Sequence, residues 1–309
     1  MTQHNRKNLL GFLMTSLMLS GCGADNSDLN GRNSGKGMLT VSITDAAVDS
    51  ATAVWVQFTG VEIKPEEGKS LHYDFEKPVS INLLNLQGSL SQAFFNNSMV
   101  DSGRYNWARL KVKAELDGTL DSYIKLDDGS EHELEIPSSA QTGLKVNTPF
   151  DVTANASNQI TIDFDLRKSI VFSTGDYKLK PSLRLVNNKD TNTVTGSFDI
   201  SLASDAGCSD ADPLTGNAVY LYEGHDIIPD DIDNKTSNPV TTALLSFNAL
   251  SGNLDYELGF IPTGDYTLAF TCQADLDMPE TDDVIVFSDT SNITVTAPET
   301  DITNLTPIR

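Results

Sequence analysis

The sequence has few cations and few residues that build catalytic or metal sites. Of its 309 residues, 21 are Lys or Arg and 43 are Asp or Glu, so the formal net charge is −22. A chain this acidic repels phosphate backbones and attracts cations, which makes nucleic acid a poor partner. Beyond the N-terminal segment, His72, His132 and His225 remain, and no two of them have the spacing of a zinc site. The chain also lacks a Gly-X-Ser-X-Gly elbow, so we expect no enzyme.

Long apolar runs are also scarce. The run Leu9–Leu19 is too short to span a bilayer, because a spanning helix needs about 20 apolar residues. It follows the basic residues Arg6 and Lys7 and precedes the tetrapeptide Leu19-Ser20-Gly21-Cys22. A basic start, an apolar run and small residues at a cleavage site are the three parts of a secretory signal.

The tetrapeptide resembles the bacterial lipobox, in which the cysteine thiol takes a diacylglycerol and the chain is cut before it. The resemblance implies a signal peptide over 1–21, a lipid on Cys22 and attachment to a membrane through several acyl chains. Gly23 follows the cysteine where an Asp would favour inner-membrane retention, which implies the outer membrane, facing the periplasm or the cell surface. A plain signal peptide with a chance cysteine is the alternative.

Two cysteines remain after Cys22, and they are Cys208 and Cys272. An exported protein can form disulfides, and two leftover thiols are a natural pair. Two free thiols are the alternative. Metal binding by these two alone is disfavoured, because structural zinc takes four ligands.

The rest of the chain divides into a linker and two domains. Residues 22–37 are mostly Gly, Asn, Ser and Asp and predict a flexible linker. Period-two alternation with frequent turns predicts a β-sandwich over 38–190, followed by a polar boundary at 187–192. About seven short strands predict an immunoglobulin-like or transthyretin-like sandwich over 194–309. The predicted fold class is all-β, with two β-sandwich domains.

Three local expectations follow from the patterns. The spacing of Leu83, Leu86, Leu90 and Phe94 predicts one short helix near 83–96. Cys272 shares the parity of Phe270 and should face the core. The last strands should be supplied by Val284, Val286, Ile293 and Val295.

Most of the acidity belongs to the second domain. Residues 38–193 carry 15 Lys and Arg against 21 Asp and Glu, whereas 194–309 carry two cations against 20 carboxylates. Oxygen-only clusters suit Ca²⁺, and a solvated acidic loop is the alternative. Neither of two acidic loops matches the EF-hand pattern. The calcium candidates are Asp275, Asp277, Asp282 and Asp283, with Glu280 beside them, and a second loop carries Asp226, Asp230, Asp231 and Asp233.

The first domain offers weaker candidates. Asp163 and Asp165 share a strand face and could bind a cation or act as an acid/base pair. Alternatively they pair across strands with Arg109, Lys111 and Lys113. Trp107 shares the polar face of Arg109 and Lys111, which hints at a binding surface. Packing is the alternative for Trp107 and for three further rings that could stack on sugars, namely those of Trp55, Tyr220 and Tyr222.

Six motifs of the first domain occur together, and they are Thr44-Asp45-Ala46 with Asp49, Leu83-Leu84-Asn85-Leu86, Gly103-Arg104-Tyr105 with Arg109-Leu110, Pro137-Ser138 with Thr142-Gly143-Leu144-Lys145, Asp163-Phe164-Asp165-Leu166-Arg167-Lys168-Ser169 and Leu179-Lys180-Pro181. Together these motifs resemble one family, the bacterial lipoprotein domain of unknown function 4382, over about 38–186. The sequence departs from the family at Ala47, where Pro is usual, and at Asn82, where Asp is frequent. The resemblance implies a lipoprotein β-domain and no activity.

Three functional hypotheses remain open. The first is a lipid-anchored cell-envelope lipoprotein with a non-enzymatic binding or scaffolding role, whose partner is a protein or a carbohydrate of the envelope. The second is a carbohydrate- or calcium-binding module on the envelope. The third is a hydrolase accessory or cryptic enzyme. No cofactor is expected other than Ca²⁺.

Overall fold

The computed structural model describes residues 35–46, 51–136, 143–173, 175–180, 182–204, 208, 215–233, 237–279, 281–288, 290–296 and 303–305. The predicted signal peptide and Cys22 lie outside these residues, as does most of the predicted linker. Within the described ranges, no helix is long and apolar enough to cross a membrane. The predicted fold class is confirmed, because the chain is almost entirely β and forms two sandwiches, each of two sheets.

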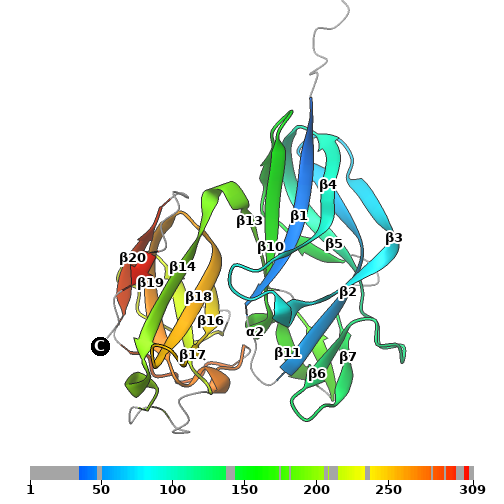
Figure 1. The fold of residues 1–309 in the computed structure, drawn as a ribbon. Helices are drawn as coiled ribbons and strands as arrows, with labels where there is room; N and C mark the ends of the chain where they lie inside the picture. The colour runs from blue at the N-terminus through cyan, green and yellow to red at the C-terminus, as the bar shows by residue number, and fades with distance from the viewer. Residues whose placement is uncertain are drawn as a thin grey trace, which may run out of the picture. The chain divides into compact units, whose positions relative to one another are not determined.

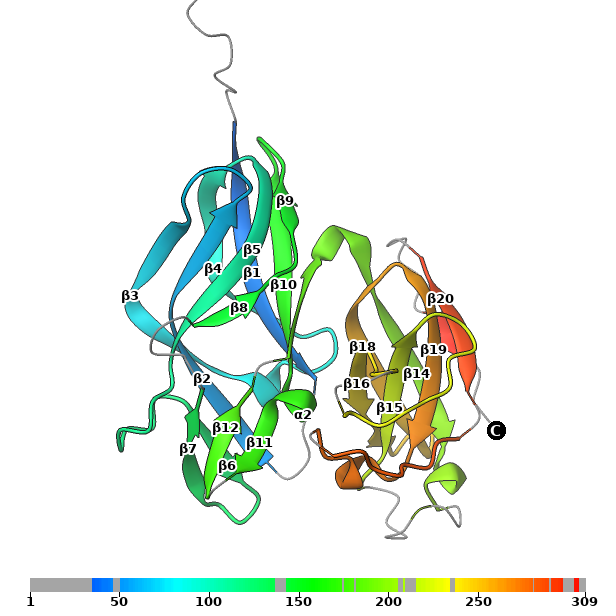
Figure 2. The ribbon, with the colours of Figure 1, turned by 180° about the vertical axis from the view of Figure 1, so that it is seen from behind.

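The first sandwich runs from β1 to β13. One sheet has the strand order β13-β10-β1-β4, and the other has the order β11-β12-β7-β6-β2-β5-β8, with β3 added to β2 and β9 to β5. Figures 1 and 2 show β1 between β4 and β10. The bounds are β1 Lys36–Ala46, β2 Ala51–Pro65, β3 Leu71–Asn82, β4 Gln92–Asp101, β5 Gly103–Lys113, β6 Tyr123–Leu126, β7 Glu131–Glu135, β8 Leu144–Val146, β9 Phe150–Val152, β10 Ser157–Asp165, β11 Ile170–Ser173, β12 Asp176–Leu179 and β13 Leu183–Asn187.

Alternating apolar side chains from both of these sheets meet in one core. Phe58 of β2 and Phe164 of β10 are fully buried, with ring centroids 6.2 Å apart in an edge-to-face contact. Such a pair adds about 1 kcal/mol beyond the area that it buries. The short helix α2 (Leu166–Ser169) follows β10 directly, and Asp165 caps it by accepting from the Lys168 N–H.

The second sandwich runs from β14 to β21, with the sheet orders β17-β18-β14-β21 and β16-β15-β19-β20. Phe198 of β14 and Phe270 of β19 join the two sheets, with ring centroids 5.1 Å apart. β14 begins at Thr191, inside the stretch predicted as a polar boundary. The bounds are β14 Thr191–Asp199, β15 Ala218–Glu223, β16 Thr241–Leu244, β17 Ser246–Asn248, β18 Asn253–Pro262, β19 Gly264–Thr271, β20 Ser291–Val295 and β21 Thr303–Leu305, with 3₁₀ turns η1 Leu83–Asn85, η2 Asn188–Asp190, η3 Ile200–Ser204 and η4 Ala274–Leu276.

β15 is buried on both faces. Val219 and Leu221 face the core between the two sheets, whereas Tyr220 and Tyr222 belong to a separate apolar cluster on the other face. A strand with two buried faces reads as a continuous apolar run rather than an alternating one. Something other than a sheet must therefore cover the face that bears the two tyrosines.

The predicted helix near 83–96 is wrong. Only the 3₁₀ turn η1 forms, and Phe94 belongs to strand β4, which pairs with β1. The Thr44 hydroxyl lies within hydrogen-bond distance of the carbonyl oxygens of Leu86 (2.9 Å) and Leu90 (2.7 Å). In a helix, these oxygens would instead accept hydrogen bonds from N–H groups of the following turn. The helical spacing of the apolar residues therefore arises from a turn followed by a strand.

The expectation for the last strands is half right. Ile293 and Val295 face the core from β20, as predicted. Val284 is 94% exposed and Val286 is 53% exposed, and neither lies in a strand. Their segment is instead part of a loop that covers β15, as described below.

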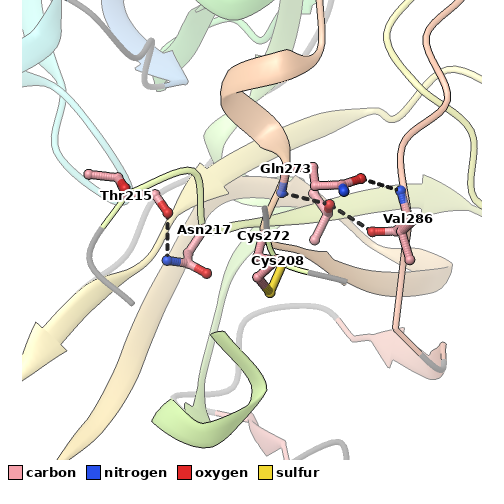
Figure 3. The surroundings of a disulfide bond; sticks show 7 residues. Cys208, Thr215, Asn217, Cys272, Gln273 and Val286 are labelled. Carbon is pink, nitrogen blue, oxygen red and sulfur yellow. Dashed lines mark hydrogen bonds between the residues drawn. A yellow bond between two sulfur atoms is a disulfide. The ribbon is translucent and has the colours of Figure 1, made fainter. Parts of the chain in front are cut away.

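The predicted disulfide is present. Cys208 and Cys272 are bonded, and they are 64 residues apart in the sequence (Figure 3). Cys272 is buried in the core of the second sandwich beside Phe270, as its parity predicted. The bridge ties the segment after η3 to the end of β19.

Replacing both Cys208 and Cys272 with Ser should destabilise the second sandwich by about 4 kcal/mol, because the unfolded chain regains the entropy of an open loop. Urea unfolding followed by circular dichroism measures the difference. Treating the double variant with reductant is the control, since reductant should weaken only the native protein. Equal denaturation midpoints for native protein and variant would contradict the prediction.

Candidate calcium site

Two acidic loops cover the tyrosine face of β15. One follows β15 itself and the other follows β19. Ile232 from the first loop is fully buried in the cluster of Tyr220 and Tyr222. Phe287 from the second loop lies edge-on to both rings, with centroid distances of 5.3 Å to Tyr220 and 6.5 Å to Tyr222. These apolar contacts place the acidic segments of both loops side by side.

The second loop is also held at its base, next to the disulfide (Figure 3). The Val286 N–H donates to the Gln273 side-chain oxygen (2.8 Å), and the Thr271 hydroxyl donates to the Val286 carbonyl (2.8 Å). Ala274 is fully buried, and its N–H donates to the Gly216 carbonyl. The described residues at the base of this loop are therefore held against the sandwich, whereas Asp282 and Val284 farther along it are exposed.

Five carboxylates meet where the two loops touch, and we call them the acidic cluster. They form two overlapping groups, each with ligand atoms that all lie within 4.8 Å of one another. The inner triad is Asp231, Asp277 and Asp283, and the outer triad is Asp231, Asp233 and Asp282. Asp231 belongs to both.

Hydrogen bonds orient the inner triad. The Tyr220 hydroxyl donates to Asp277 Oδ2 at 2.5 Å, and the Ile232 N–H lies 3.1 Å from Asp277 Oδ1. The Met278 N–H donates to Asp283 Oδ2 at 2.8 Å, and the Asp283 N–H donates to Asp231 Oδ2. Each carboxylate is therefore fixed by a neighbour from the opposite loop or from its own turn.

One oxygen of the cluster has no partner. Asp231 is only 1% exposed, and no described residue donates a hydrogen bond to its Oδ1. Buried polar atoms almost always have a partner, so a buried carboxylate oxygen without one indicates a binding place for a cation or a water. Its place in both triads favours a cation.

Burial and mutual repulsion raise the pKa values of the cluster. Desolvation raises the pKa of Asp231 above its ordinary value, and the charges of Asp233 and Asp282 add to the rise. Desolvation likewise raises the pKa of Asp277, although the Tyr220 hydroxyl and the Ile232 N–H oppose this. Both shifts mean that burial and mutual repulsion destabilise the ionised carboxylates of the cluster, and a cation among them would reduce that cost.

The geometry and the donor set fit Ca²⁺. Calcium takes six to eight oxygen ligands at about 2.3–2.6 Å, so oxygens on opposite sides of the ion are about 5 Å apart. The 4.8 Å limit within each triad is compatible with this spacing. Zinc prefers nitrogen and sulfur ligands, and neither triad contains His or Cys.

The structure brings together three of the four predicted calcium candidates. Asp277, Asp282 and Asp283 belong to the triads, whereas Asp275 is exposed on η4 and belongs to neither. The pivotal ligand is Asp231, which the sequence placed in a separate acidic loop. The two loops lie close together because Ile232 and Phe287 pack against the same two tyrosines. No local sequence pattern predicts this packing. Calcium binding itself stays a prediction.

Arg167, a cation of the first sandwich, reaches the cluster. Arg167 of α2 is buried, and its Nη1 donates to the Ala274 carbonyl at 2.6 Å. The positive charge of this guanidinium lowers the pKa of Asp277, against the larger effect of desolvation. Arg167 therefore offsets part of the negative charge of the cluster.

The aspartates of β10 make other ion pairs than those expected. Asp163 contacts Arg184 at 2.7 Å, and Asp165 contacts Lys168 at 2.8 Å. Both aspartates are buried rather than surface residues. The expected partners lie on the opposite sheet and pair elsewhere, as Arg109–Glu62, Lys111–Asp74 and Lys113–Asp121.

Trp107 is packed between cations. Arg109 Cζ lies 4.8 Å from the ring centroid, and Lys145 Nζ lies 4.7 Å from it. Cation–π contacts of this kind are worth about 0.5–1 kcal/mol at exposed sites and account for a half-exposed tryptophan without a ligand. A binding role for Trp107, Arg109 and Lys111 stays a prediction. Tyr220 and Tyr222 are buried and cannot form part of a sugar-stacking surface.

A serine, a histidine and an aspartate do meet on the β6–β7 hairpin. His132 Nε2 lies 3.0 Å from Ser130 Oγ, and Ser130 Oγ donates to Asp128 Oδ1 at 2.6 Å. In a catalytic triad the aspartate orients the histidine and leaves the serine hydroxyl free to attack. Here Asp128 engages the serine instead, so the arrangement does not make a triad.

The comparisons with known proteins bear on the first sandwich. Residues 36–181 match the family model described as "Domain of unknown function (DUF4382)". These residues form a DUF4382 domain. The match confirms the resemblance predicted over about 38–186, and the DUF4382 domain includes β1 to β12 and the α2 turn that carries Arg167.

No curated protein matches the chain. Two solved structures overlap most of its length. A candidate adhesin from Bacteroides ovatus is 9% identical, with 87% of this chain and 93% of that chain covered, at a TM-score of 0.20. A fimbrial protein from Bacteroides ovatus is 12% identical, with 84% and 45% covered, at a TM-score of 0.17. Scores this low do not establish a shared fold.

The raised pKa values predict an unusual pH dependence for the calcium-free protein. A carboxyl whose pKa is higher in the folded state binds its proton more tightly there, so it favours folding as the pH falls through that raised pKa. As the pH is lowered from neutral toward about 4, the ordinary pKa of an Asp carboxyl, the melting temperature of chelator-treated protein should therefore rise. Thermal unfolding of the native chain and of Asp277→Asn measures this.

The comparison isolates the cluster, because lower pH also reduces the repulsion among all other carboxylates. Asp277→Asn removes one titrating group and should show a smaller rise than the native chain. Identical pH profiles for the two proteins would show that Asp277 has an ordinary pKa in the folded state.

Proposed function

We propose that this chain is a lipid-anchored, non-enzymatic protein of the cell envelope whose acidic cluster binds calcium. The observation that supports calcium binding is the buried, unpartnered Oδ1 of Asp231 at the meeting point of two carboxylate triads. A divalent cation there is also favoured by the oriented carboxylates and by the large excess of negative charge in this domain. This function combines the envelope role with the calcium-binding alternative.

The proposed ion has a structural role in presenting the two loops. Without it, the loops are held by Ile232, Phe287 and the hydrogen bonds of Asp277, while their carboxylates repel one another. A bound Ca²⁺ converts that repulsion into a cross-link between residues about 45 positions apart in the chain. The loops then present a defined surface to a protein or carbohydrate partner.

Calcium should raise the melting temperature of the chelator-treated protein. A ligand at 100 times its Kd stabilises the folded state by about 2.7 kcal/mol. Asp231→Asn should abolish the shift, because Asp231 is the shared ligand and an amide is a weaker donor. Thermal scans with calcium and with chelator measure the effect.

The matched control is Asp275→Asn, which removes one charge from the same loop but lies outside both triads. It should retain the full calcium shift. If calcium leaves the melting temperature of the native protein unchanged, the site is refuted. If Asp231→Asn and Asp275→Asn lose the calcium shift equally, the shift arises from general screening of the negative charge and not from binding at the triads.

The lipid anchor is proposed from the sequence, because Leu19-Ser20-Gly21-Cys22 resembles the lipobox. Gly23 after the cysteine supports the outer membrane, and the structure bears on neither point. Replacing Cys22 with Ser should release the protein from the membrane fraction, because no thioether can form. Membrane fractionation, with mass spectrometry of the mature N-terminus, measures this.

Ser20→Ala is the control for that experiment, because a small residue still precedes the cysteine. It should stay in the membrane fraction. Recovery of Cys22→Ser with the membranes, at the level of the native chain, would show that something other than a lipid on Cys22 holds the protein there.

The non-enzymatic role has two supports. The Asp128–Ser130–His132 arrangement lacks the order of a triad, and the chain carries no Gly-X-Ser-X-Gly elbow. The net charge of −22 argues against nucleic acid as the partner.

A further inference from the structure

We propose that a cavity between the two sandwiches binds a ligand with ammonium groups, and that this ligand is an amino sugar. The cavity has a volume of about 900 Å³, and ligand sites of such size are frequent where two domains meet. One wall comes from β1, β10 and the segment before β4, and the other comes from β14, β16, β17 and β18. The cavity is separate from the acidic cluster, because no residue belongs to both.

Direct contacts between the sandwiches hold the two walls together. The Ser89 N–H of the first sandwich donates to Glu257 Oε1 of the second at 2.7 Å. Beside this bond the two backbones touch, since a Cβ atom added at Gly259 would lie only 1.9 Å from the Gly88 carbonyl oxygen. The cavity is therefore framed by close contacts on one side, and a glycine is needed there.

Every charged side chain in the lining is acidic. The carboxylates are Asp45, Asp163, Asp255 and Glu257, and the described residues of the lining include no Lys, Arg or His. A cavity lined by one sign of charge concentrates ligands of the opposite sign. None of these four carboxylates belongs to a described group of three whose ligand atoms lie within 4.8 Å of one another. Their spread does not suit one metal ion and does suit a larger organic cation.

Two of these carboxylates are buried and have oxygens without a donor. Asp163 is 5% exposed, and Arg184 Nη2 holds its Oδ2 at 2.7 Å, while no described residue donates to its Oδ1. Asp45 is 4% exposed, and neither of its oxygens has a partner among the described residues. Buried polar atoms are almost always paired, so these oxygens indicate acceptors for a ligand. Ammonium groups are suited to them, because hydrogen bonds between two charged groups are the stronger ones.

Burial also destabilises the ionised form of Asp45. Desolvation raises the pKa of this carboxyl well above its ordinary value, and the charges of Asp163 and Asp165 add to the rise. The N–H groups of Leu166 and Ala46 oppose the rise, although neither has the geometry of a hydrogen bond to the carboxyl. An ammonium group in the cavity would lower the pKa of Asp45, because a nearby positive charge favours the ionised form.

Hydroxyl groups of the lining favour a sugar over a simple amine. Thr195, Ser197 and Ser246 belong to the wall of the second sandwich, and Ser89 belongs to the opposite wall. The hydroxyls of Thr195 and Thr242 are buried without a partner among the described residues. A hydroxyl both donates and accepts, as the ring hydroxyls of a sugar do. A protonated polyamine offers donors alone and could not accept from these threonines.

Calorimetry of the full mature protein tests the proposal, with chelator present so that metal binding does not contribute. The probe is the β-1,4-linked trimer of glucosamine, and the N-acetylated trimer keeps the rings without the charge. The native chain should bind the glucosamine trimer roughly tenfold more tightly than the acetylated one, because hydrogen bonds to charged groups are lost in the latter. Spermidine, a linear polyamine, should bind more weakly than the glucosamine trimer.

Matched variants separate binding in the cavity from general attraction to an acidic chain. Asp255→Asn and Glu257→Gln each remove one charge from the lining but keep an oxygen for the present hydrogen bond. Each should weaken binding of the glucosamine trimer by roughly tenfold. Asp275→Asn removes one charge outside the cavity and should bind as the native chain does. Gly259→Ala changes no charge, but its Cβ must shift the walls, so it should also weaken binding.

Equal binding of the two trimers would overturn the ammonium ligand, and spermidine binding as tightly as the glucosamine trimer would overturn the sugar. Equal losses in Asp255→Asn and Asp275→Asn would show attraction to the whole chain rather than a site. A native chain that binds neither trimer would overturn the proposal outright. Circular dichroism of each variant checks that it is folded. Each of these outcomes leaves the proposed calcium site as it stands, because the two sites share no residue.

Discussion

The structure of the acidic cluster depends on one packing interaction, the covering of Tyr220 and Tyr222 by two loops. β15 is buried on both faces, and its second face has no sheet to pack against. Ile232 and Phe287 supply that cover, so the loops that carry them cannot leave without exposing two tyrosine rings. Burial of such side chains is worth about 1.5–3 kcal/mol each, and this energy is available to hold negative charges close together.

The cost of holding those charges explains the chemistry of the site. Raised pKa values for Asp231 and Asp277 show that the folded protein would bind a proton there more readily than the unfolded chain. A divalent cation would offset the same charge more completely than a proton, since it coordinates several oxygens at once. Arg167 offsets part of the negative charge of the cluster without any bound ion. Because Arg167 belongs to α2 of the DUF4382 domain, a side chain of that domain lowers the pKa of Asp277 in the acidic domain.

Sequence patterns predicted the β-class and the disulfide, because each follows from local alternation or from composition, and calcium binding by the acidic loops stays a prediction. They failed where tertiary contacts override the local pattern. The apolar residues at 83, 86, 90 and 94 have helical spacing, but they form a turn and a strand because β1 offers a pairing edge. Val284 and Val286 alternate as residues of a strand do, but they lie in a loop. This loop packs Phe287 against the Tyr220 ring instead of pairing with a neighbouring strand.

The sequence by itself determined the chemistry available to this protein, and it predicts a lipid-anchored address. A lipobox-like tetrapeptide, two spare cysteines and an excess of carboxylates in the second half can all be read without a fold. Only the tertiary structure decided which carboxylates meet. Asp231 and Asp277 are far apart in the chain, and their ligand atoms come within 4.8 Å because separate loops close over one face of a strand. Proximity across that distance depends on packing, and packing is a property of the whole domain rather than of any segment.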